Sequence, residues 1–130
     1  MAIKVVYKNQ CTPQEQVDFT GGGSRWYLDS DCGKKLSGSA ELSLTTVDTF
    51  TDEVAVTTSP VTVANGSQDF VFIKNLGGGS GNDLHITIDN TNYLMVLSSG
   101  ETFASKVHTA AVILVKCLSG DTTAQFLEGT

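Results

Sequence analysis

The chain has 130 residues, a formal net charge of -6 and 40% hydrophobic residues. This length and composition predict one globular domain with a core of its own, and they exclude disordered and membrane-spanning classes of protein. The basic residues are scattered, and Lys34 and Lys35 are the one adjacent pair. No basic stripe is available to neutralise a phosphate backbone, so we expect neither nucleic acid nor a membrane as a partner.

The first 20 residues contain no continuous apolar segment, which predicts that the protein has no secretory signal and stays in a cytoplasm. Its three cysteines, Cys11, Cys32 and Cys117, include no pair at C-x-x-C spacing. An odd number of cysteines without a signal predicts free thiols. Cys117 lies in an apolar pattern and is expected in the core, whereas the sequence leaves open whether Cys11 and Cys32 meet in space.

The N-terminal third differs from the rest of the chain. Residues 1–8 predict a short strand. Residues 9–37 contain Pro13 and a run of three glycines, and within them the strand pattern is limited to residues 25–28. We expect residues 9–37 to form either an irregular loop or an extended arm, and both alternatives stay open.

From residue 38 onward the pattern is that of strands separated by turns. In residues 84–89, for example, Leu84, Ile86 and Ile88 alternate with polar residues and are expected to point inward. Thr102 to Ala111 predict one turn of helix. The other predicted strands are 39–45, 53–58, 60–65, 70–75, 93–97, 110–118 and 122–129.

The strand count, nine or ten including the N-terminal pieces, and the turn spacing are typical of a sandwich or a barrel. We therefore predict an all-β fold: a single antiparallel β-sandwich, jelly-roll-like, in which residues 38–130 form the core. Residues 1–37 are the possible arm or irregular region of the same single domain, 1–130.

A glycine-rich stretch is a candidate site for a bound ion. Residues 78–83, GGSGND, match the start of the nonapeptide that builds calcium-binding β-rolls. One copy cannot complete such a site, and the apolar Leu84 follows Asp83 one residue too early. A phosphate-binding fingerprint also fails, because the stretch leads into a strand rather than a helix. We predict a hairpin loop joining the strands 70–75 and 84–89.

Other candidates for chemistry are weak. His85 and His108 have no partner at metal-ligand spacing. Asp29 and Asp31 resemble the start of an EF-hand loop, but Gly33 stands at the next ligand position. We therefore expect no enzymatic activity, no cofactor, no metal site and no small-molecule substrate.

Trp26 and Tyr27 are the candidate partner-binding residues. They form either a binding platform or an anchor that holds the N-terminal region on the sandwich. The anchor is favoured, because tryptophan usually contributes buried area.

The second half of the chain resembles a family. Its features are a strand ending in Lys74-Asn75, a variable loop, an alternating strand and a strand from Tyr93 followed by Gly100-Glu101. A C-terminal hairpin then runs from Val115-Lys116 to Phe126-Leu127. Over about residues 61–128 this order resembles the small all-β virion proteins of tailed bacteriophages.

The resemblance implies a structural protein of a virion, expected first as a capsid decoration (cement) protein. The implied partners are the major capsid protein and copies of the chain itself, as a trimer. The expected location is the capsid surface, after assembly in the host cytoplasm. The alternatives are a neck, tail or fibre component, or a glycan- or ligand-binding β-sandwich module.

Overall fold

The computed structural model describes residues 3–28, 30 and 34–130. The regular elements of this part of the chain are all strands, which confirms the all-β antiparallel prediction. Contacts divide the chain into two compact units, Val6–Glu41 and Leu42–Thr130, the latter together with the first five residues. Within the described residues no helix has the length and apolarity to span a membrane.

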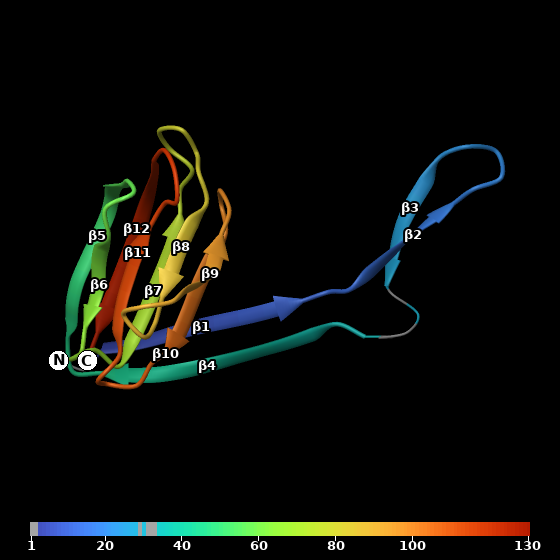
Figure 1. Cartoon of the computed structure of the whole chain (residues 1–130). Helices are drawn as coiled ribbons and strands as arrows, with labels where there is room; N and C mark the ends of the chain where they lie inside the picture. The colour runs from blue at the N-terminus through green and yellow to red at the C-terminus, as the bar shows by residue number, and fades with distance from the viewer. Residues whose placement is uncertain (1–2, 29, 31–33) are drawn as a thin grey trace. The chain divides into compact units, whose positions relative to one another are not determined.

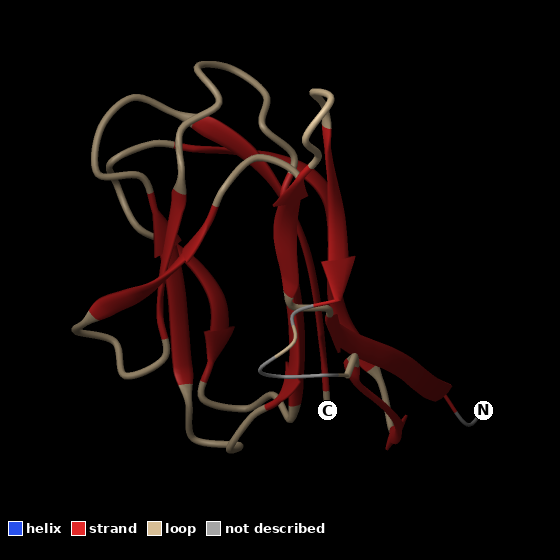
Figure 2. Cartoon of the chain, turned by 90° about the vertical axis from the view of Figure 1, so that its right-hand side faces the viewer, coloured by secondary structure: helices blue, strands red, loops and turns tan. Residues whose placement is uncertain are grey.

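Eight strands of the larger unit form two four-stranded sheets, in the orders β10-β7-β12-β5 and β6-β11-β8-β9. Figure 2 shows their strands in two layers, as expected for a sandwich. The strands are β5 (Val47–Val56), β6 (Val61–Asn65), β7 (Phe70–Asn75), β8 (Leu84–Thr87), β9 (Tyr93–Leu97), β10 (Thr102–Lys106), β11 (Val112–Lys116) and β12 (Thr122–Gly129).

The pairing of these strands is nested about the β8–β9 hairpin. β8 pairs with β9, β7 with β10, β6 with β11 and β5 with β12, and every pair is antiparallel. Two further pairings, β7 with β12 and β8 with β11, join these pairs into the two sheets (Figure 1). Apart from the β8–β9 turn, each connection between consecutive strands therefore leads from one sheet to the other.

This connectivity corrects the hairpin predicted for the glycine-rich loop. β7 and β8 belong to different sheets, so the segment between them crosses from one layer to the other. Eight residues suffice to span the distance of about 10 Å between packed sheets. The sequence pattern of a crossing loop and of a hairpin loop is the same, because both need glycines and polar residues.

The core lies between the two sheets. Alternate residues of the inner strands point into it and are fully buried, as expected for period-two patterning. Its members are Val56, Val63, Ala64, Val71, Ile73, Leu84, Ile86, Leu97, Ile113, Val115, Cys117, Ala124 and Phe126. The predicted core position of Cys117 is confirmed, and burial raises the pKa of its thiol.

The inward prediction is right for Leu84 and Ile86 and wrong for Ile88, which is 52% exposed. β8 ends at Thr87, and its pairing with β9 shifts register between Ile86 and Thr87. This irregularity ends the alternation before Ile88.

The helical turn predicted for residues 102–111 is also wrong. Thr102 to Lys106 form the edge strand β10, which pairs with β7 over its whole length. The strand pairing continues to Val107, whose N–H donates to the Asp69 carbonyl at 2.8 Å. A turn then follows, in which the Ala111 N–H donates to the His108 carbonyl.

The smaller unit is built from strands as well, although the sequence of residues 9–37 predicted just one strand, at residues 25–28. β1 (Ile3–Cys11) pairs with β4 (Leu36–Leu44), and β2 (Gln14–Asp18) pairs with β3 (Ser24–Leu28). Two two-stranded sheets have no second layer of their own, and none of the described residues between Val6 and Glu41 is buried. Cys11 is exposed, whereas Cys32 lies outside the described residues, so their pairing stays open.

The corrected register of β8 can be tested directly. Ile86→Ala leaves a cavity in the core and should lower the free energy of unfolding by about 2–5 kcal/mol. Ile88→Ala, two residues away and half exposed, should change it by less than about 0.5 kcal/mol. Urea unfolding followed by circular dichroism measures both, and equal losses would contradict the register described above.

Candidate functional site

The β2–β3 hairpin carries both residues that the sequence nominated. Its five cross-strand pairs run from Gln14 opposite Leu28 to Asp18 opposite Ser24. Beyond them the Phe19 N–H donates to the Gly23 carbonyl, and the Gly22 N–H donates to the Phe19 carbonyl, both at 3.0 Å. Gly22 and Gly23 have φ of 91° and 84°, a conformation that other residues adopt at a cost, so the glycine run closes this turn.

Trp26 and Tyr27 point to opposite faces of the hairpin. Trp26 pairs with Gln16, and Tyr27 pairs with Glu15. Neighbouring residues of a strand alternate between its faces, so these two rings cannot form one continuous platform. Trp26 is 61% and Tyr27 46% exposed. Neither side chain is buried within the hairpin, and both the platform and the anchor role stay predictions.

Further apolar side chains are exposed on both faces of the hairpin. Leu28 shares a face with Trp26, and Val17 shares the opposite face with Tyr27. Their exposed fractions are 39% and 40%, and that of Phe19 in the turn is 43%. An isolated two-stranded hairpin is at best marginally stable in water. Since exposed apolar clusters mark interaction sites, the hairpin is the candidate partner-binding element.

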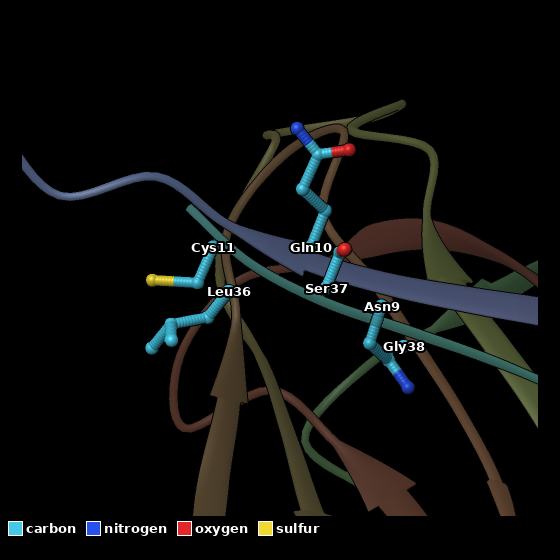
Figure 3. A pocket seen from close by; sticks show the side chains of 6 residues that line it. All are labelled: Asn9, Gln10, Cys11, Leu36, Ser37 and Gly38. Atoms are coloured by element: carbon cyan, nitrogen blue, oxygen red, sulfur yellow. The ribbon is translucent and has the colours of Figure 1, made fainter. Parts of the chain in front are cut away.

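A hollow of about 370 Å³ lies against the β1–β4 ribbon of the same unit. It is lined by Asn9, Gln10, Cys11, Leu36, Ser37 and Gly38. Figure 3 shows the Gln10 side chain pointing away from that of Asn9, on the other side of the ribbon. These side chains do not converge on one point, so the hollow is not built to hold a small ligand.

The glycine-rich loop between β7 and β8 is held by the turn before β12. The Gly78 N–H donates to Thr123 Oγ1 at 3.0 Å, and the Ser80 N–H donates to Asp121 Oδ1 at 2.7 Å. The hydrogen bonds from Ser80 lower the pKa of the Asp121 carboxyl. A Cβ on Gly77 would lie 1.8 Å from Ser99 Oγ, so glycine is required there. The loop is a packed structural element.

Asn75 is a buried polar hub at the end of β7. Its Nδ2 donates to the carbonyls of Asn82 and Leu97 at 3.0 and 2.8 Å. Its Oδ1 accepts from Thr122 Oγ1 at 2.6 Å and from the Gly77 N–H at 3.0 Å. The side chain is fully buried and joins both sheets to the crossing loop.

The histidines and acidic residues that the structure describes do not converge on a metal site. Among the described residues no group of three or more His, Cys, Asp or Glu side chains is placed to hold an ion. His85 lies on β8, whereas His108 lies in the turn after β10, where its Nδ1 accepts from the Ala110 N–H. The EF-hand-like pair Asp29 and Asp31 lies outside the described residues.

Asp89 organises the turn between β8 and β9. Its carboxylate accepts the Thr91 N–H at 2.9 Å, the Asn92 N–H at 2.7 Å and the Asn92 amide at 2.8 Å. These hydrogen bonds, above all the one from the Asn92 N–H, hold the pKa of Asp89 well below its usual range. The shift serves turn geometry, since each donor is local.

Glu128 on β12 is the least compensated acidic group. Its Oε2 is buried and has no hydrogen-bond partner among the described residues. Burial raises the pKa of the Glu128 carboxyl, and the charge of Asp48 adds to the rise, while a hydrogen bond from Thr49 opposes it. Asp48 itself has a lowered pKa, because Thr130 and Thr46 donate to it.

Sequence reasoning missed Asn75 and Glu128. Asn75 ends an apolar strand just before the glycine run, and a polar residue there also fits a loop start. Glu128 lies two residues after the inward-facing Phe126. Because residues two apart in a strand share a face, this spacing could have predicted that the Glu128 side chain points inward.

Comparison with known proteins finds no matching family model, no similar curated protein and no similar solved structure.

The hub can be tested by substitution. Asn75→Ala removes four hydrogen bonds and leaves buried groups unpaired, at about 1–3 kcal/mol each. We expect the free energy of unfolding to fall by roughly 3 kcal/mol or more. The exposed Asn9→Ala is the control and should change little. A loss below about 1 kcal/mol for Asn75→Ala, measured by urea unfolding, would show that the hub does not hold the loop.

Glu128 predicts a pH dependence of stability. Its folded-state pKa lies above the ordinary value of 4.5, so the ionised carboxylate destabilises the folded state. The free energy of unfolding therefore falls as the pH rises from the unfolded pKa through the folded pKa. Glu128→Gln removes this loss and should be more stable than the parent at pH 7, with a smaller difference at pH 4. Denaturant unfolding at both pH values checks this, with Glu53→Gln as an exposed control. An equal difference at both pH values would contradict the assignment.

Proposed function

We propose that the chain is a non-enzymatic structural protein of a tailed-phage virion. Its proposed role is that of a capsid decoration protein, which stabilises the head through contacts with the major capsid protein and with copies of itself. A neck, tail or fibre component is the alternative within the same class. The proposed location is the capsid surface, after assembly in the host cytoplasm.

The observation that carries the proposal is the nested strand pairing of the larger unit. We infer from it a jelly roll, because eight strands pair first with last around a central hairpin and wind into two sheets. Jelly rolls occur in viral capsid and lectin domains, so the fold supports the proposal without deciding it.

The smaller unit adds a second argument. It orders Val6–Glu41 as strands although none of its described residues is buried. Ordering a residue costs about 1–2 kcal/mol of backbone entropy alone, which burial normally offsets. A unit of this kind gains its stability by contact with a neighbouring surface, as a protein that bridges capsid subunits requires.

The perturbed acidic groups also favour a structural role. Asp48, Asp89 and Asp121 owe their lowered pKa to hydrogen bonds that fix turns and strand ends. Glu128 lies at a strand end, where its raised pKa comes from burial. A glycan-binding module would instead use aromatic faces for stacking, and Trp26 and Tyr27 point to opposite sides of the hairpin.

Copy number per particle tests the proposal. Quantitative mass spectrometry of purified virions should find the chain in hundreds of copies, near the number of capsid subunits or a third of it. About a dozen copies or fewer would move the protein to the neck or tail. Absence from the particle would contradict the virion role and favour the binding-module alternative.

A further inference from the structure

An apolar pocket of about 330 Å³ opens beside the edge strand β10. It is lined by Ile88, Phe103, Ser105, Lys106, Val107, His108 and Ala111. Phe103 and Val107 pack against the core and Ile88 is half exposed. The pocket therefore continues the core to the surface.

The ionisable side chains that line the pocket are basic. Lys106 and His108 line it, and no carboxylate does. His108 Nδ1 accepts the Ala110 N–H, which leaves Nε2 as its donor. In a chain of net charge -6 this is a local exception. The complementary occupant fills the pocket with apolar side chains and carries an acidic group that can lie beside Lys106.

β10 also has an edge that none of the described strands pairs with. It is the outermost strand of its sheet and pairs with β7 on one side. Phe103 and Ser105 lie opposite the inward residues Ile73 and Val71, so they face the sandwich interior. The side chain of Lys106, the next residue, leaves the strand on the opposite face. An extended segment that pairs with this edge could place alternate side chains in the pocket.

The chain itself contains a segment with this chemistry. β2 is an edge strand that pairs with β3 alone among the described strands. Its residues include Glu15 and Asp18 and no basic side chain. Val17 and Phe19, exposed by 40% and 43%, flank Asp18 and share the opposite face, because the hairpin ladder continues to Phe19.

We propose that the β2 edge of one copy pairs with the β10 edge of a second copy. Val17 and Phe19 then enter the apolar pocket, and Asp18 lies beside Lys106 on the alternate face. The interaction uses two different surfaces, so it generates a closed ring or an open chain of copies. It deepens the self-association part of the proposed function and rests on it.

The second copy is favoured over other occupants by the match of charge, alternation and open edges. Among the described strands, β2 has an unpaired edge with acidic side chains and β10 has an unpaired edge with basic side chains. Free edges normally pair or are protected, and pairing these two satisfies both at once. It also provides buried surface for a unit in which none of the described residues is buried.

Charge reversal tests the proposal on the full chain. Asp18→Lys and Lys106→Glu should each raise the self-dissociation constant at least about tenfold, and the double variant should recover most of the loss. Lys74→Glu on β7 changes the same charge away from the pocket and should have no effect. Sedimentation equilibrium measures the constants, and circular dichroism checks that each variant folds.

The outcomes separate this proposal from the virion role. A parent chain that stays monomeric at about 100 μM would overturn the exchange of β2 between copies. Equal effects of Lys106→Glu and Lys74→Glu, or no recovery in the double variant, would overturn it too. Phe19→Ser, which keeps all charges, should weaken association as well. The count of copies per virion depends on none of these results.

Discussion

The two sheets depend on the last two strands of the chain. β12 lies between β5 and β7, and β11 lies between β6 and β8, so each of them pairs on both sides. Their inward residues, among them Val115 and Phe126, lie in the common core. The C-terminal hairpin predicted from Val115-Lys116 to Phe126-Leu127 is wrong, because β11 and β12 belong to different sheets. Because their pairings join segments far apart in sequence, the sandwich is completed when these two strands are placed. The conformation of the crossing loop between β7 and β8 also depends on β12, because the loop is held by Asn75 and by the turn before β12.

The strands of the larger unit could be predicted because their side chains alternate between a core and a surface. Tyr93–Leu97 and Thr122–Gly129 have the predicted limits, and Cys117 is in the core as expected. Which strands are neighbours could not be predicted, since glycine-rich loops serve hairpins and crossings equally well. The register shift that exposes Ile88 arises from pairing with β9, which a single strand pattern does not encode.

The N-terminal unit was hard to predict for a different reason. None of the described residues in 9–37 is buried, so the alternation that marks a half-buried strand is absent from this part of the sequence. The sequence singled out Trp26 and Tyr27. That they point to opposite faces of the hairpin could be known only from the register of β2 and β3. The same register shows apolar groups on both faces of the hairpin, which is the basis for proposing it as a contact element.

The central claim is that the described residues between Val6 and Glu41 have no core of their own. We propose that contacts with other chains stabilise them. Amide hydrogen exchange on the dilute, monomeric protein tests this most directly, because it reports local stability along the chain. The account predicts slow exchange in β7, β8, β11 and β12 and exchange faster by orders of magnitude throughout Val6–Glu41. Protection of Val6–Glu41 equal to that of the sandwich strands would contradict it.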